Sequence, residues 1–225
     1  MDVEEVKNNC GNIIGFENSF PCPDGSQAPL AAFKRDAKFL ETEGHHITIP
    51  AGHLGVDTEV HLGVVISEEA SEISPDAALS KIGGYVVALN SRLRLREFTK
   101  ASETDIFNTT DEFKGGVVIS PLVSKDTLEH PNVATIWAAI NNQEVQRSNF
   151  TSAKYTVQEL LSKASQLTTL KKGDIILTGS PSGATYVRAG DTVEIGIEGL
   201  IRSEFSLQKA IEVDVVPSDR QDSIY

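Results

Sequence analysis

The chain contains few residues of several types, and each shortage excludes a class of protein. It has only two cysteines, Cys10 and Cys22, whereas a short secreted scaffold stapled by disulfides carries more, so we expect a reducing compartment. No apolar run approaches the roughly 18 residues that a membrane span needs. Lysine and arginine number 20 against 32 acidic residues. The formal net charge of −12 argues against general nucleic-acid binding, which requires a positive surface.

The first residues show no targeting pattern. Residues 1–5 are acidic, whereas mitochondrial transit peptides are basic and poor in acidic residues, and no secretory signal precedes the rest of the chain. We expect the protein in the mitochondrial matrix or in the cytoplasm.

Alternating apolar residues predict strands over residues 58–66, 84–90 and 133–140. Asn141 and Asn142 tolerate positive φ, so they predict a hairpin turn after the third of these strands. Thr156 and Glu159 have capping-box spacing and predict the start of a helix whose apolar face is formed by Leu160, Leu161, Ala164 and Leu167. Many strands with one clear helix predict a mostly-β fold with a few helices, of the α+β class.

The chain contains no internal repeat and no low-complexity linker. Residues 1–55 are rich in Gly, Pro, Asn and Asp, and they predict an irregular N-terminal arm that packs on the main domain. The main domain is expected over residues 56–215. Residues 216–225 predict a polar tail.

Residues 173–201 form the most informative segment. The loop from Gly179 to Gly183 contains two glycines, a proline and two serine hydroxyls, and the pattern predicts a strand on each side of it. Such a loop brings backbone N–H groups and hydroxyls close to a ligand. Two strands joined by a flexible turn explain the spacing equally well.

This segment, together with residues 59–66 and 84–90, resembles the fumarylacetoacetate hydrolase superfamily, and within it the acylpyruvase and oxaloacetate decarboxylase branch. The resemblance implies a rolled, mostly-β catalytic domain and a homodimer. It also implies a site in which two glutamates and one aspartate hold Mg²⁺ or Mn²⁺, which binds a 2-oxo acid and stabilises an enolate.

The resemblance places Glu59, His61 and Asn90 at the three metal positions, and two of them depart from the family pattern. Mg²⁺ favours oxygen ligands, and this set has one carboxylate where the family has three. Each lost carboxylate removes a Coulomb partner worth about 4 kcal/mol at ~4 Å and an effective dielectric constant of ~20. We therefore expect no cofactor, or, if any is bound, a divalent ion (Mg²⁺, Mn²⁺ or Zn²⁺).

The catalytic positions also depart from the family. Asp111 stands where the family has a lysine two residues before a phenylalanine, here Phe113. The hydrolytic members use a His and Glu dyad near the N-terminus, and residues 15–20 contain no histidine. Without a base, water attack loses roughly 10²–10⁴-fold of acid–base assistance.

The positions that bind substrate are better preserved. Ser180 replaces a threonine and keeps its hydroxyl, and Pro181 and Gly183 match the family. Arg94 stands where the family places an arginine near the substrate, and Lys34 matches a pocket lysine. Arginine binds carboxylates bidentately, although Arg94 also fits a solvated strand face.

Three functions remain open. The favoured hypothesis is a catalytically degenerate member of the family with a structural or binding role in a larger assembly. The second is an active C–C bond hydrolase or lyase with altered metal ligands, of the acylpyruvate hydrolase or oxaloacetate decarboxylase type. The third is a metal-free binder of a small 2-oxo acid.

Overall fold

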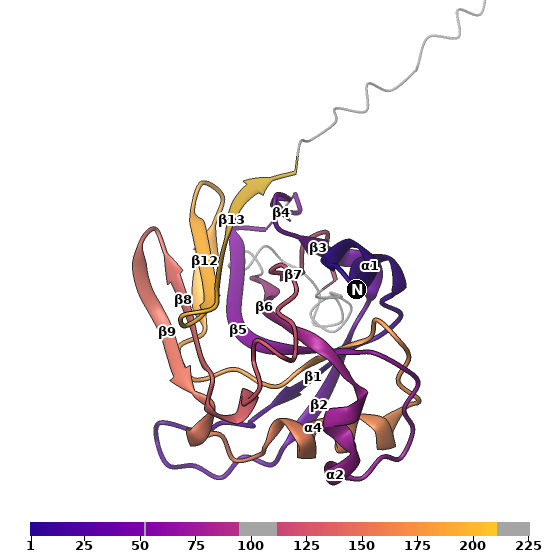
Figure 1. Ribbon diagram of the computed structural model, residues 1–225. Helices are drawn as coiled ribbons and strands as arrows, with labels where there is room; N and C mark the ends of the chain where they lie inside the picture. The colour runs from indigo at the N-terminus through magenta and orange to yellow at the C-terminus, as the bar shows by residue number, and fades with distance from the viewer. Residues whose placement is uncertain (52, 95–111, 211–225) are drawn as a thin grey trace, which may run out of the picture.

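The computed structural model describes residues 1–51, 53–94 and 112–210, and two β-sheets form most of this part of the chain (Figure 1). The first sheet contains, in order across it, β2 (Ala31–Arg35), β1 (Ile13–Glu17), β10 (Ile175–Leu177), β5 (Gly55–Ile66), β6 (Ile82–Arg94), β7 (Val117–Ile119) and β3 (Leu40–Thr42), with β11 (Thr185–Arg188) paired to β5. The second contains β4 (Ile47–Ile49), β13 (Ile201–Lys209), β12 (Thr192–Ile197), β8 (Thr135–Ile140) and β9 (Gln143–Asn149).

The helices are short and lie outside the sheets. Within the described ranges they are α1 (Val3–Asn9), α2 (Pro75–Ala78) and α4 (Val157–Leu167), with single 3₁₀ turns at η1 (Ala37–Phe39), η2 (Leu79–Lys81), η3 (Pro131–Val133) and η4 (Phe150–Ser152). Helices α2 and α4 lie side by side at the lower end of the molecule in Figure 1, and they are in contact. The expected mostly-β fold with a few helices is confirmed.

Strands β5 and β6 form the centre of the first sheet. They pair antiparallel along almost their whole length, from the Gly55–Arg94 pair to the Ile66–Ile82 pair. One face of β5 is buried in the larger core, where it meets residues of the second sheet, as the alternation predicted. The residues of β5 on this face are Val60, Leu62, Val64 and Ile66. Glu59 and His61 therefore lie on the opposite face of the sheet.

The predicted hairpin and helix start are both confirmed. Asn141 and Asn142 connect β8 to β9 with φ of 49° and 67°. Thr156 caps α4, because its hydroxyl accepts a hydrogen bond from the Glu159 N–H while the Glu159 carboxylate accepts one from the Thr156 N–H. Both features could be predicted from the sequence because each depends on the chemistry of a few neighbouring residues.

The predicted apolar face of α4 is correct except at its last residue. Leu160, Leu161 and Ala164 are fully buried, whereas Leu167 is 62% exposed. Leu167 is the last residue of the helix, and the chain continues in extended conformation at Thr168, so nothing packs over this side chain in the way that the core covers Leu160.

The first 55 residues contribute β1, β2 and β3 to the first sheet and β4 to the second. Asp174 is fully buried and connects this segment to β10. Its carboxylate accepts hydrogen bonds from the backbone N–H groups of Gly11, Asn12 and Lys171, and from the Asn12 side chain. The proposed boundary near residue 55 stays a prediction, and the polar tail over residues 216–225 lies outside the described residues.

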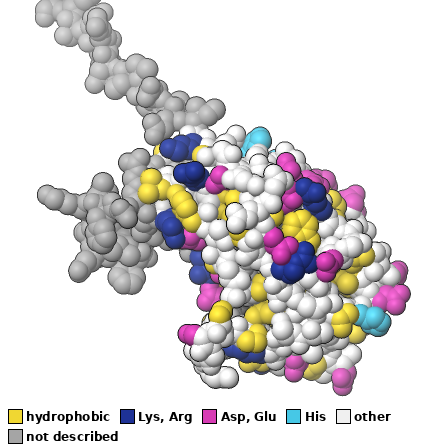
Figure 2. All heavy atoms as spheres, turned by 90° about the vertical axis from the view of Figure 1, so that its left-hand side faces the viewer, with side chains coloured by type: hydrophobic (Ala, Val, Ile, Leu, Met, Phe, Trp, Pro, Cys, Tyr) yellow, Lys and Arg dark blue, Asp and Glu magenta, His cyan; other side chains and the backbone are white. Residues whose placement is uncertain are grey.

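On the surface over the second sheet, acidic and basic side chains are interspersed and hydrophobic ones occur in small groups (Figure 2). Within the described ranges, the search for a helix long and apolar enough to cross a membrane finds none.

Candidate functional site

The strand pair β5–β6 brings the three predicted metal-position residues together on one face. Glu59 lies directly opposite Asn90, and His61 lies opposite Ala88, one step along the same face. Directly opposed residues on one face of a sheet have Cβ atoms about 4.5–5.5 Å apart. Glu59, His61 and Asn90 are therefore neighbours, as the sequence predicted.

Glu59 and His61 form the polar contact of this group. The Glu59 Oε2 and His61 Nε2 atoms are 3.7 Å apart, which is longer than a hydrogen bond, so we treat the contact as electrostatic. This contact with His61 is the main reason that the pKa of Glu59 lies below its usual value. Burial acts in the opposite direction, and the positive charge of Arg92 adds to the lowering. Glu59 is accordingly ionised at neutral pH.

His61 and Asn90 are sealed inside the protein. Each is 1% exposed, and the His61 ring lies edge-on against the Phe33 ring at 6.4 Å between centroids. Among the described residues, neither ring nitrogen of His61 and neither side-chain polar atom of Asn90 has a hydrogen-bond partner. The side chain of Glu59, in contrast, is 31% exposed. Of the three residues, Glu59 is the one that lines the pocket described next.

That pocket has a volume of about 260 Å³ and lies where β1, β5 and β6 meet the loop that follows β10. It is lined by Phe16, Glu17, Asn18, Phe20, Pro21, Cys22, Pro23, Glu59, Arg92, Ser180, Pro181, Ser182, Gly183 and Ala184. Drug-sized ligands occupy pockets of roughly 300–1,000 Å³, so this one suits a smaller molecule. We call it the Arg92 pocket.

Arg92 is the cation of this pocket, and sequence reasoning did not select it. It follows Asn90 by two residues on β6, which places both side chains on the same face. Its guanidinium forms an ion pair with Glu17 at the end of β1 and lies over the Phe33 ring, 5.7 Å from the centroid. The two-residue spacing from Asn90 is the signal in the sequence that could have found it.

The loop predicted to bind substrate lies on the opposite wall. Gln146 of β9 holds it, because the Gln146 Nε2 atom donates to the Ser180 hydroxyl at 3.0 Å and to the Pro181 carbonyl at 2.8 Å. The Gln146 Oε1 atom accepts from the backbone N–H of Val60 on β5 at 2.9 Å. Gln146 thus ties the loop to the strand that carries Glu59, and no local pattern in the sequence indicated this role.

Gly183 shows why this loop requires glycine. Its φ is +111°, and a Cβ atom there would meet the carbonyl oxygen of Val145 at 2.9 Å. A side chain at Gly183 would therefore push the loop away from β9.

Arg94 and Lys34 lie in other surroundings. Arg94 forms an ion pair with Asp57 at 3.1 Å and lies over the Tyr186 ring at 4.6 Å. Lys34 is exposed on β2 and, with Arg35 and Asp36, lines a separate pocket. The structure does not bring either into the lining of the Arg92 pocket, and their role in substrate binding stays a prediction. Asp111 lies outside the described residues.

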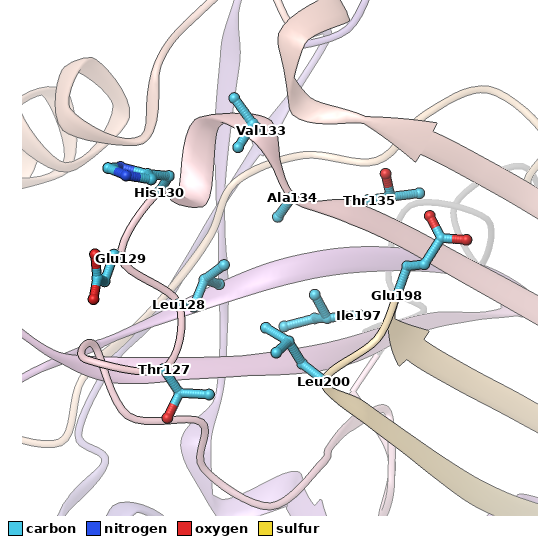
Figure 3. Close-up of a pocket in the computed structure, with 10 residues that line it drawn as sticks. All are labelled: Thr127, Leu128, Glu129, His130, Val133, Ala134, Thr135, Ile197, Glu198 and Leu200. Atoms are coloured by element: carbon cyan, nitrogen blue, oxygen red, sulfur yellow. The ribbon is translucent and has the colours of Figure 1, made fainter.

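A larger pocket of about 490 Å³ lies at the start of β8 and the end of β12. Figure 3 shows the side chains of Leu128, Ile197 and Leu200 pointing toward one another across it. Glu198 at its edge is engaged by Arg147 at 2.9 Å. None of the residues that the sequence selected as functional lines this pocket, so we place the candidate site at the Arg92 pocket.

The residues at the metal positions do not fit a hard dication that must also reach a ligand. The set offers one carboxylate, and within the described part of the chain no group of three His, Cys, Asp or Glu residues is arranged to hold a metal. Arg92 places a positive charge close to Glu59, which opposes a second cation. His61 and Asn90 are each 1% exposed and are not among the lining residues of the Arg92 pocket.

Two packed sheets and a small polar pocket beside the central strand pair characterise the described part of the chain. Residues 5–207 match the family described as fumarylacetoacetate (FAA) hydrolase C-terminal. The chain belongs to this family.

Among characterised relatives, the mitochondrial oxaloacetate tautomerase of Caenorhabditis elegans is 34% identical over 181 residues, which cover 80% of this chain and 84% of the relative. The human mitochondrial oxaloacetate tautomerase is 29% identical over 177 residues, covering 79% and 80%. A fumarylpyruvate hydrolase from Pseudomonas aeruginosa, whose structure was solved with Mn²⁺ and pyruvate, has a TM-score of 0.74 at 19% identity and covers 89% of this chain and 91% of that one. The last likeness shows the fold alone.

Proposed function

We propose that this chain binds a small carboxylate ligand in the Arg92 pocket and has lost the dication-dependent reaction that its family resemblance implies. One observation carries the proposal. Of the three residues at the metal positions, only Glu59 lines the pocket, while His61 and Asn90 are 1% exposed. A metal ion that activates a substrate must contact that substrate. The arrangement supports ligand binding without that contact.

The pocket contains the groups that a small carboxylate requires. The Arg92 guanidinium provides planar N–H donors that match a carboxylate. The Ser180 hydroxyl and the exposed Ser182 line the same space, and glycine at position 183 keeps the loop close. Glu17 accepts a hydrogen bond from Arg92, which fixes the direction of the guanidinium at the wall of the pocket.

The relatives indicate which carboxylates to test. Two are named for oxaloacetate, and a structural neighbour was solved with pyruvate. All are 2-oxo acids, so a small 2-oxo acid is the first candidate ligand of this chain. The relatives' names support a 2-oxo acid as the ligand, and the change of metal-position residues supports binding rather than the relatives' reaction.

The second candidate is an active hydrolase or lyase of this family that uses a borderline ion such as Mn²⁺ or Zn²⁺. The buried and unpartnered nitrogens of His61 and amide oxygen of Asn90 favour it, because these atoms are potential ligands beside a carboxylate. Metal analysis of the purified protein decides between the two. Less than stoichiometric metal supports the first candidate, and a stoichiometric ion supports the second.

The test of the favoured function combines binding with turnover. After treatment with EDTA, the protein is titrated with pyruvate by calorimetry and assayed for oxaloacetate tautomerisation, oxaloacetate decarboxylation and acetylpyruvate cleavage. We expect binding that is unchanged by added Mn²⁺, with no turnover above the metal-only background. Turnover that depends on the protein contradicts the proposal.

We also propose that the protein works in mitochondria, as a homodimer or as a subunit of a larger assembly. The mitochondrial names of two relatives support the compartment. Fractionation of cells that express the tagged full-length protein, followed by size-exclusion chromatography with light scattering, tests both statements. A monomer that stays in the cytosol would contradict them.

A further inference from the structure

The charges that line the Arg92 pocket do not suit a ligand that is only anionic. The described lining has three charged side chains, Glu17, Glu59 and Arg92, which give it a formal charge of −1. Arg92 is already paired with Glu17. A carboxylate that binds Arg92 therefore approaches two negatively charged side chains. Each such approach is unfavourable, because like charges repel at short range.

Glu59 is the charge that a ligand has to compensate. Its side chain is 31% exposed and lines the pocket. His61, whose Nε2 atom lies 3.7 Å from Glu59 Oε2, is 1% exposed and is not among the lining residues. The side of Glu59 that faces the pocket thus lacks a cation among the lining residues other than Arg92, which Glu17 shares.

We infer that the Arg92 pocket takes a small zwitterion of the α-amino acid type, with its carboxylate at Arg92 and its ammonium group at Glu59. The ligand's own ammonium group then supplies the positive charge beside Glu59, and no metal ion is needed. This inference rests on the proposed function, because it names the class of carboxylate that the same pocket binds. It predicts a preference for a 2-amino acid over the 2-oxo acid with the same carbon skeleton.

The walls of the pocket restrict the ligand's side chain. Pro21, Cys22 and Pro23 form the side that follows β1, and they are apolar. The volume of about 260 Å³ leaves little room beyond the carboxylate and the ammonium group. A short apolar side chain, as in alanine, fits this wall better than a second carboxylate, which would add another negative charge.

The test compares L-alanine with pyruvate, which differ in having an ammonium group or a ketone on the same three-carbon chain. Calorimetry on the EDTA-treated full-length protein is expected to show at least tenfold tighter binding of L-alanine. Glu59→Gln is expected to lower the affinity for L-alanine at least tenfold without weakening pyruvate. Arg92→Gln is expected to weaken both ligands. Arg147→Gln and Glu144→Gln remove the partners of an exposed ion pair on β9 and are expected to leave both affinities unchanged.

The outcomes separate this inference from the function on which it rests. Tighter binding of pyruvate than of L-alanine overturns the inference and leaves the proposed function standing. Failure of the wild-type protein to bind either compound overturns the proposed function itself. If Glu59→Gln and Glu144→Gln lose the same affinity for L-alanine, and circular dichroism shows that both are folded, the role of Glu59 is overturned. If Arg94→Gln lowers the affinity for both ligands and Arg92→Gln does not, the placement of the carboxylate at Arg92 is overturned.

Discussion

Glu59 lines the pocket, and its contact with His61 lowers the pKa of its carboxyl group. Removing the imidazole with His61→Gln is expected to raise the pKa of Glu59 toward its ordinary value of 4.5. A carboxyl group with a lower pKa in the folded than in the unfolded protein stabilises the fold above its unfolded pKa, and this contribution is lost as the pH falls through the folded pKa.

Two measurements check this expectation. Titration of the Glu59 side-chain carbon by NMR is expected to give a lower pKa in the wild-type protein than in His61→Gln. The melting temperature of the wild-type protein is expected to fall further than that of Glu59→Gln between pH 7 and pH 3. If the melting temperatures of the wild-type protein and Glu59→Gln depend on pH in the same way, the contact between Glu59 and His61 has no effect on stability.

The lost carboxylates can be restored. The double variant His61→Glu, Asn90→Asp is expected to bind Mn²⁺ at least tenfold more tightly than the wild-type protein, because two negative charges are added beside Glu59. Buried carboxylates without a counterion are costly, so the variant is expected to melt at a lower temperature after EDTA and to recover with Mn²⁺. Calorimetry and thermal unfolding measure both effects.

The control for this variant adds the same charge elsewhere. Gln143→Glu, Gln208→Asp places two carboxylates on exposed positions of β9 and β13, and it is expected to leave Mn²⁺ affinity unchanged. Equal Mn²⁺ affinity in the wild-type protein and in His61→Glu, Asn90→Asp would mean that these positions no longer form a common site.

At the scale of elements, the position of the loop after β10 depends on hydrogen bonds from Gln146 of β9. Gln146→Leu removes two hydrogen bonds to the loop and leaves the buried N–H of Val60 without its partner. We expect a loss of about 2 kcal/mol in the free energy of unfolding, together with faster amide exchange over residues 179–184. The matched control is Gln143→Leu, an exposed position on the same strand. Unchanged exchange in Gln146→Leu would mean that the loop is held by other contacts.

Strands β1 and β10 are joined through Asp174. Asp174→Ala leaves the N–H groups of Gly11, Asn12 and Lys171 without their shared acceptor in a buried place. The free energy of unfolding is expected to fall by roughly 3 kcal/mol, measured by urea denaturation. Asp126→Ala changes an exposed carboxylate and is the control. If Asp174→Ala loses less free energy of unfolding than Asp126→Ala, Asp174 does not anchor the N-terminal strands.

Across the molecule, local signals in the sequence predicted the parts of the fold that depend on local chemistry. The alternation of Val60 to Ile66, the Asn141–Asn142 turn and the Thr156 cap are each determined within a few residues, and each is confirmed. The neighbourhood of Glu59, His61 and Asn90 followed from the family resemblance, and the structure brings them together. The exposure of Leu167 was missed because packing at a helix end depends on what lies beyond it.

The pocket could not be predicted in the same way, because it is formed by segments far apart in the chain. Arg92 pairs with Glu17, and Gln146 bonds to Ser180 and Val60, across separations that no local pattern records. Whether His61 and Asn90 face the pocket or the interior also depends on the position of Phe33 on β2. The sequence predicted that Glu59, His61 and Asn90 lie together, but it did not show which of them line the pocket.

The central claim is that no dication joins Glu59, His61 and Asn90 to a ligand. Crystals soaked in Mn²⁺ together with the small carboxylate that binds best, measured at the manganese absorption edge, test it directly. The account predicts ligand density beside Arg92 and no anomalous peak between these three side chains. A well-occupied manganese peak there, at coordination distance from all three and from the ligand, would contradict it.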